Sequence, residues 1–179
     1  GLSESAACQL PDGRIFFLSR CSSVLPTQDH PGGPGVKRFC VSEDGGKTLS
    51  DPMPLTYEDG CYVYSARSMP DVWRSSKNGR VYVILNITLG PVHGADPRNS
   101  LQIAELNPET LSVKRDQVTI VDSKQEEHHP LVRFSNWSTI EDRTTGNLLL
   151  FMKLHFSEHC PIRKGYDHSI YRYEVELPD

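Results

Sequence analysis

The chain alternates short apolar runs with polar, glycine-containing turns, and this pattern predicts β-strands. Three turns, Asp-Gly-Arg, Asn-Gly-Arg and Thr-Gly-Asn, place Gly13, Gly79 and Gly146 at intervals of 66 and then 67 residues. An apolar run follows each turn at once: IFFLS, VYVIL and LLLFM. Runs that are rich in β-branched and aromatic residues and bounded by turn residues are typical of strands.

Each apolar run belongs to a longer repeating unit. A further strand-like segment follows in each unit: KRFCVSED, SLQIAEL and SIYRYEVEL. The first two units add a fourth segment, PMPLTY and QVTIVD, whereas the third ends without one. Helical periodicity is almost absent, and NPETL fits a turn. Repeated four-stranded antiparallel sheets indicate a β-propeller. We therefore expect one all-β domain of about three blades, over residues 1–59, 60–124 and 125–179.

Composition narrows the class of protein. The 179 residues suffice for one domain, and 19 Lys and Arg against 23 Asp and Glu give a formal charge of -4. This balance argues against a nucleic-acid partner, which calls for a basic surface. No apolar run is long enough to cross a membrane, and no signal peptide is visible.

The cysteines are scattered and odd in number, and none forms a Cys-x-x-Cys motif. They are Cys8, Cys21, Cys40, Cys61 and Cys160. Such a set fits neither a disulfide framework nor a zinc site, and it favours buried thiols in a reducing, cytoplasmic compartment.

The segment SEDGGKTLSDP resembles an Asp-box, the BNR repeat Ser-x-Asp-x-Gly-x-Thr-Trp. It departs from that pattern at Leu49, where the family has tryptophan. The matching positions are Ser42, Asp44, Gly46 and Thr48. We expect a hairpin turn in which Asp44 bonds its own backbone and the glycines adopt positive φ. This turn would mark the fold and lie away from any chemistry.

The opening segment ESAACQLPDGRIFFLSR resembles a hairpin of the sialidase (neuraminidase)-like superfamily. There a Glu-Ser pair opens one strand and an arginine closes the next. The resemblance covers nearly the whole chain, as the C-terminal half of a six-bladed propeller. It implies that Glu4 assists a tyrosine nucleophile. It also implies that Arg20, together with Arg98 in DPRNSLQIAEL, clamps a substrate carboxylate.

The hairpin geometry supports the Glu4–Arg20 pairing independently of the family. Glu4 lies eight residues before Asp12 and Arg20 lies eight after it. An antiparallel hairpin centred there places the two side chains opposite each other, at the end that faces the propeller channel. A guanidinium fork suits a carboxylate ligand. A cross-strand salt bridge without a ligand explains the pair equally well.

The third unit departs from the family. FSNWSTIED has Trp137 before Ser138, where a sialidase has its nucleophilic tyrosine. Indole has no ionisable hydroxyl, so we expect no classical sialidase activity from the isolated chain. Tyr166 would replace the nucleophile only if its loop folded inward. Trp137 either stacks on a sugar, with Asn136 bonding hydroxyls, or belongs to the core.

Other chemistry has weaker support. The run Glu126–His129 fits a solvated loop, since neighbours on a strand point to opposite faces and rarely share one ion. The cluster of His, Glu and Cys at 155–168 has helical spacing in a segment without a helical pattern. We expect neither a metal nor a cofactor.

Two hypotheses follow, and the question of enzymatic activity stays open. The first is a glycoside-hydrolase-related protein that binds an anionic or neutral glycan in the propeller channel. The second is a non-catalytic interaction or carbohydrate-binding module. Because three blades leave two faces open, two copies could complete a propeller by homodimerisation. The chain would otherwise be a fragment of a longer protein.

Overall fold

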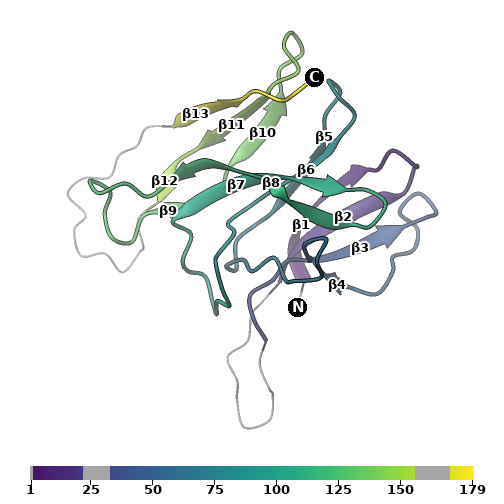
Figure 1. Cartoon of the computed structure of the whole chain (residues 1–179), viewed down its shortest axis with the longest axis horizontal. Coiled ribbons are helices and arrows are strands. Elements are labelled where there is room, and N and C mark those ends of the chain that lie inside the picture. Colours follow the sequence, from purple (N-terminus) through teal and green to yellow (C-terminus); the bar gives the residue numbers. More distant parts are fainter. Residues whose placement is uncertain (1, 22–32, 156–169) are drawn as a thin grey trace.

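The computed structural model describes residues 2–21, 33–155 and 170–179. Every regular element within these ranges is a β-strand. The described residues contain no helix that is long and apolar enough to cross a membrane. Figure 1 shows three antiparallel sheets that follow one another in chain order, from purple through teal to yellow. The prediction of an all-β fold with about three antiparallel blades is confirmed, although the third blade has three strands among the described residues.

The first blade is a four-stranded meander in the order β1-β2-β3-β4. Its strands are β1 (Leu2–Gln9), β2 (Ile15–Cys21), β3 (Arg38–Ser42) and β4 (Met53–Pro54). A β-bulge interrupts the β1–β2 ladder between Ser3 and Ser5. The predicted segments IFFLS and KRFCVSED therefore form adjacent strands, and PMPLTY contributes the short outer strand.

The second blade repeats this meander in the order β5-β6-β7-β8. Its strands are β5 (Asp71–Arg74), β6 (Val81–Leu85), β7 (Ser100–Asn107) and β8 (Ser112–Ser123). β8 extends over 12 residues and is longer than QVTIVD alone predicts. NPETL forms the turn between β7 and β8, as expected.

The third blade has the order β10-β11-β13 and lies beside a small two-stranded pair of β9 and β12. The strands are β9 (Arg133–Phe134), β10 (Ser138–Glu141), β11 (Leu148–Met152), β12 (Leu154–His155) and β13 (Tyr171–Val175). The run Glu126–His129 is a turn, which confirms the loop prediction. The three sheets fall within the predicted blade ranges, and the division at 59/60 and 124/125 stays a prediction.

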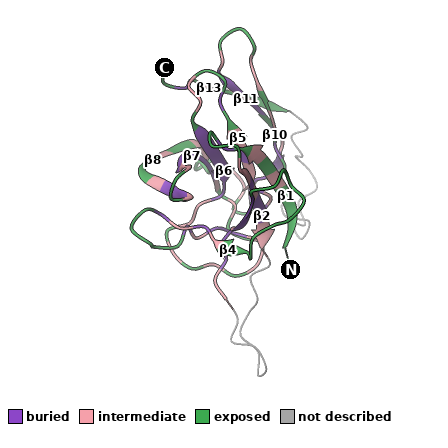
Figure 2. Ribbon diagram, turned by 90° about the vertical axis from the view of Figure 1, so that its right-hand side faces the viewer, coloured by how far each residue is buried: buried purple, intermediate pink, exposed green. Residues whose placement is uncertain are grey.

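The core consists of two apolar clusters, one on each side of the second blade. In β6, Val81, Val83 and Leu85 join the cluster against the first blade, whereas Tyr82 and Ile84 join the cluster against the third. Successive side chains of a strand point to opposite faces, so a strand covered on both faces needs a continuous apolar run. VYVIL is such a run, and all of β6 is buried in Figure 2.

In the third blade, the described residues show one covered face. Leu148, Leu150 and Met152 pack against the second blade, whereas Phe151 is exposed. Ile140, on the neighbouring strand, is 60% exposed. The expectation of buried thiols holds for Cys40 and is wrong for Cys61, which lies exposed in a turn.

The turn at Asp44 forms the hydrogen bonds that its sequence predicts. The Asp44 carboxylate accepts from the backbone N–H groups of Lys47 and Thr48, at 3.0 and 2.9 Å. It also accepts from the Thr48 hydroxyl at 2.7 Å. Gly45 and Gly46 have φ of 75° and 92°, which residues with a side chain rarely adopt. These bonds to the charged form lower the pKa of Asp44 to about 2.

Candidate functional site

The predicted ion pair between Glu4 and Arg20 is present. Arg20 Nη1 donates to Glu4 Oε2 at 2.5 Å. The predicted register is wrong by one residue, because Ser3 and not Glu4 lies opposite Arg20. Glu4 is the extra residue of the β1 bulge and has φ of 47°, which is uncommon for a residue with a side chain. The bulge turns the carboxylate toward the guanidinium.

The cations Lys37 and Arg98 lie near this ion pair, because the charges of Arg20 and Glu4 act on both of them. Arg67 is joined to Arg98 through its backbone carbonyl. In a meander, the start of the first strand, the end of the second and the start of the third share one edge of the sheet. Arg20 lies near the end of β2, and Lys37 directly precedes β3. Arg67 lies in the segment before β5, and Arg98 lies between β6 and β7. We call Arg20, Lys37, Arg67 and Arg98 the basic cluster.

Lys37 is buried, with 1% of its surface exposed. Its Nζ donates to the carbonyl oxygens of Ala66 and Ser68, at 2.7 and 2.5 Å, and to Ser68 Oγ at 3.3 Å. Burial lowers the pKa of Lys37 to about 7, and repulsion from Arg98 and Arg20 contributes. Lys37 therefore connects the first blade to the segment that precedes the second.

Arg98 is held by three protein acceptors. Nε donates to the Ala95 carbonyl at 2.7 Å, Nη1 donates to Ser135 Oγ at 2.8 Å, and Nη2 donates to the Arg67 carbonyl. A guanidinium has five N–H donors, so two of them have no acceptor among the described residues. Burial lowers the pKa of Arg98, and the nearby Arg133 guanidinium lowers it further.

The cluster has few carboxylates of its own. Glu4 bonds Arg20, and Asp96 binds Arg133 through two hydrogen bonds of 2.7 and 2.6 Å. Arg20 Nε and Arg67 Nε are both buried without a hydrogen-bond partner in the described part of the chain. Buried donors without partners are costly, which makes this edge of the sheets suited to an acceptor from outside.

The two predicted residues of the third unit differ in their exposure. Asn136 is exposed, has φ of 60°, and lies next to Ser135, which binds Arg98. Trp137 is 3% exposed and belongs to the cluster between the second and third blades. This burial supports the core interpretation of Trp137 and leaves no ring face for a sugar.

Sequence reasoning missed Lys37 and Arg67. Lys37 precedes Arg38, and such a pair usually indicates a solvated strand end. Side chains of neighbouring residues on a strand point to opposite faces, so only one residue of the Lys37-Arg38 pair can point inward. This alternation was the sequence signal for a buried Lys37. Arg67 is the one charged residue in CYVYSARSMP, just before a blade begins. Apart from His155, the candidate residues of the segment 155–168, Tyr166 among them, lie outside the described residues.

A separate groove of about 600 Å³ lies along β7 and β8. Its lining includes Ile120, which is 61% exposed, and Arg115, whose guanidinium lies 3.7 Å from the Tyr57 ring centre. None of the five predicted site residues lines this groove.

Comparisons with solved structures identify the fold. The intramolecular trans-sialidase from Ruminococcus gnavus, in complex with oseltamivir carboxylate, aligns over 97% of this chain and 32% of its own, with 16% identity and a TM-score of 0.56. A protein of unknown function from Dyadobacter fermentans aligns over 87% and 44%, with 18% identity and a TM-score of 0.55. A GH43_12 protein from a capybara gut metagenome aligns over 87% and 26%, with 14% identity and a TM-score of 0.53.

These likenesses establish a fold shared with β-propeller glycosidases, and they do not single out the sialidases. The chain spans less than half the length of each of the three structures. No protein-family model matches the sequence, and no curated protein matches it.

Proposed function

We propose that this chain is the glycan-binding part of a sialidase-like propeller and that it binds an anionic sugar at the basic cluster. Arg20 and Arg98 contact the acidic group of the sugar. Glu4 accepts a hydrogen bond from a sugar hydroxyl or acts as a base, and the exposed Asn136 bonds further hydroxyls.

One observation carries this proposal: cations concentrate at one edge of the sheets in a chain with a formal charge of -4. Among the described residues, Arg20 and Arg98 have N–H donors without an acceptor, and the carboxylates nearby are already bonded to Arg20 and Arg133. An acidic sugar supplies the missing acceptors. Bonds between a guanidinium and a carboxylate are among the strongest available to a protein surface.

The test is calorimetric titration with 3'-sialyllactose and with neutral lactose. We expect binding of 3'-sialyllactose alone, weakened about tenfold to a hundredfold by Arg20→Gln or Arg98→Gln, as the loss of a charge-assisted hydrogen bond implies. Arg143 lies in the exposed turn between β10 and β11, far from the basic cluster along the blade. Arg143→Gln removes the same charge there and should leave the affinity unchanged. Equal affinity for the two sugars, or no binding of either, would refute the proposal.

We expect binding without classical sialidase turnover by this chain. Trp137 occupies the position that resembles the family's nucleophilic tyrosine, and it is buried in the core. An indole cannot attack an anomeric carbon. Hydrolysis of a fluorogenic sialoside that Glu4→Gln abolishes would contradict this expectation.

A second candidate function is an interaction module built from two copies of the chain. The outer face of the third blade favours it, because Ile140 is 60% and Phe151 is 36% exposed on neighbouring strands. An exposed apolar sheet face of this kind is typical of a protein–protein interface. Light scattering after size exclusion tests the idea: a dimer that Ile140→Asp dissociates supports it, and a monomer at high concentration rules it out.

A further inference from the structure

The Lys37 ammonium group is bonded entirely within the protein. An ammonium group has three N–H donors, and Lys37 Nζ meets three oxygen acceptors, the carbonyl oxygens of Ala66 and Ser68 and the Ser68 hydroxyl. Lys37 is 1% exposed and Ser68 is 0% exposed, so these bonds are shielded from water. Lys37 therefore does not contact a bound sugar. It acts on the basic cluster through its charge and through the segment that it holds.

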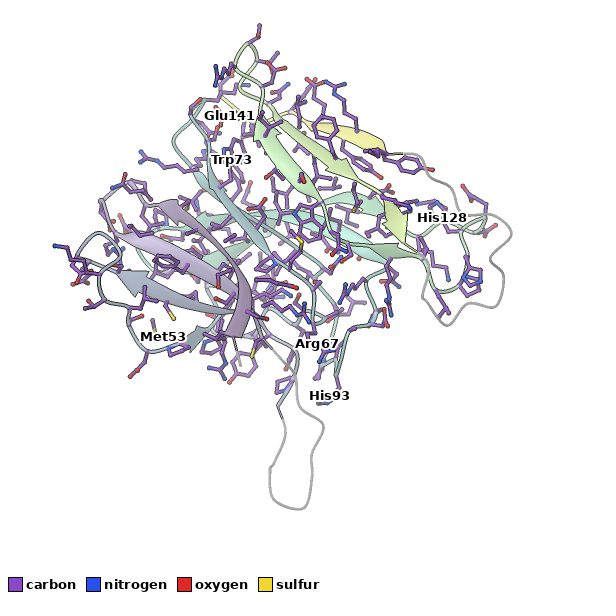
Figure 3. The ribbon with its side chains drawn as sticks, turned by 180° about the vertical axis from the view of Figure 1, so that it is seen from behind. Met53, Arg67, Trp73, His93, His128 and Glu141 are labelled. Carbon is purple, nitrogen blue, oxygen red and sulfur yellow. The ribbon has the colours of Figure 1, made fainter. Side chains whose placement is uncertain are left out.

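The segment Ala66–Ser68 is bonded in turn to Arg98. The Arg67 carbonyl, which lies between the two carbonyls that Lys37 holds, accepts from Arg98 Nη2. The Arg67 N–H donates to the Gly94 carbonyl at 2.9 Å, in the same connection between β6 and β7 that carries Arg98. Figure 3 shows Arg67 between the first blade and the loop that carries His93, in agreement with these bonds. A continuous path of hydrogen bonds and backbone thus joins the Lys37 ammonium group to the Arg98 guanidinium.

Arg98 depends on this segment for one of its three acceptors. The other two are the Ala95 carbonyl in its own loop and Ser135 Oγ, which lies between β9 and β10. Three acceptors around a planar guanidinium fix the orientation of its plane, and a bidentate bond to a carboxylate requires one particular orientation. A shift of the Arg67 carbonyl would therefore turn Arg98 away from its ligand.

Charged and titratable groups reach Lys37 from β1, β2, the bonded segment and the loop before β7. They are Glu4, Arg20, Cys21, Arg67 and Arg98. Burial, together with repulsion from Arg98 and Arg20, lowers the pKa of Lys37 to about 7. An anion bound at the neighbouring guanidinium groups favours the protonated form of Lys37, and by linkage the protonated form favours the anion. The neutral amine has one N–H donor fewer and leaves one of its three acceptors unbonded.

We infer that Lys37 is a positioning residue of the anion site, because it holds the segment Ala66–Ser68 in the place from which the Arg67 carbonyl orients Arg98. This inference rests on the proposed glycan-binding function and adds to it a group that does not touch the sugar. Two consequences follow. Removal of the ammonium group weakens binding although no contact with the ligand is lost, and the affinity for an anionic sugar falls as the pH rises through 7.

The test is calorimetric titration with 3'-sialyllactose between pH 6 and pH 9. We expect the affinity of the wild type to fall about fivefold to twentyfold over this range. Lys37→Met should bind about tenfold more weakly than the wild type at pH 6 and show no such decline. Lys37→Arg keeps its charge at every pH and should bind without the decline.

Two control variants separate Lys37 from the charges and thiol beside it. Arg38→Met removes the same charge from the neighbouring residue, whose side chain points to the opposite face, and should keep both the affinity and the pH profile. Cys21→Ser replaces the thiol near Lys37 and should also keep the pH profile. Thermal unfolding of each variant shows whether the fold is intact.

The outcomes distinguish this inference from the proposed function. If the wild type does not bind 3'-sialyllactose, the proposed function is refuted and this inference falls with it. If the wild type binds with an affinity that is constant from pH 6 to pH 9, or if Lys37→Met keeps the wild-type affinity or the decline, the role of Lys37 is refuted and the proposed function stands. If Lys37→Met does not fold, Lys37→Arg decides: binding without the decline supports the role, and the wild-type decline overturns it.

Discussion

The first and second blades use equivalent positions of one repeat for different purposes. Counted from the turn glycines Gly13 and Gly79, Arg20 and Asn86 both lie seven residues downstream. Arg20 forms a partly exposed ion pair with Glu4. Asn86 is 1% exposed, and its Nδ2 donates to two backbone carbonyls.

The two positions differ in burial and in the partner that each side chain has. Asn86 lies in the blade that is covered on both faces, so its buried amide bonds the backbone around it. The Arg20 side chain is partly exposed, so its charge stays in contact with solvent while it bonds Glu4. The same position of the repeat therefore holds a core amide in the second blade and a charged group in the first.

The largest expected effect comes from opening a cavity in the doubly covered blade. Ile84 is fully buried in β6, whereas Ile140 is 60% exposed on the third blade. We expect Ile84→Ala to lower the free energy of unfolding by about 2–5 kcal/mol. Ile140→Ala should stay within about 0.5 kcal/mol. Urea denaturation measures both, and similar losses would show that Ile140 is covered in solution.

Much of this arrangement could be predicted from the sequence. The expected strands form at IFFLS, VYVIL and LLLFM. A short apolar run between two glycine-containing turns is typical of a buried strand and fits few other structures. Among the described residues, the third sheet has three strands, as its sequence indicates. The pattern could not show that Phe151 would be exposed, because burial depends on what lies against each face.

The site was less predictable than the fold. The Glu4–Arg20 contact could be predicted from the symmetry of the hairpin. The β-bulge that creates the contact depends on a positive φ at Glu4, and no residue type in the segment signals that conformation. Lys37 was missed because its role depends on hydrogen bonds to Ala66 and Ser68, which lie 29 and 31 residues away in sequence. Arg67 was missed because its backbone carbonyl is bonded to Arg98, 31 residues away. Composition and period do not encode such long-range contacts.

Titration of Lys37 sharpens the contrast between buried and exposed cations. Its folded-state pKa of about 7 lies below the ordinary value of 10.5. Between these values the unfolded chain binds a proton that the folded chain does not, so the free energy of unfolding rises with pH. The gain between pH 7 and pH 10 is at most about 4 kcal/mol, since one pKa unit corresponds to about 1.4 kcal/mol.

The measurement compares the wild type with Lys37→Met by denaturation across this pH range. The variant lacks the ammonium group and should lose the Lys37 contribution to the slope, while other groups titrate equally in both proteins. Below pH 7, Lys37 is charged in both folded and unfolded chains, and the two curves should run parallel. Parallel curves up to pH 10 would contradict the burial of a titrating amine.

The smallest effects come from the pair of equivalent positions itself. Asn86→Ala removes the buried amide that donates to the carbonyls of Ser100 and Phe134, and we expect a loss of about 1–3 kcal/mol in the free energy of unfolding. Arg20→Ala removes a partly exposed ion pair, which should cost about 0.2–1 kcal/mol. Affinity for 3'-sialyllactose should show the reverse order, with Arg20→Ala impaired and Asn86→Ala unchanged. If Arg20→Ala lowers stability more than Asn86→Ala and leaves affinity intact, Arg20 is a structural residue and the two blades do not differ in purpose.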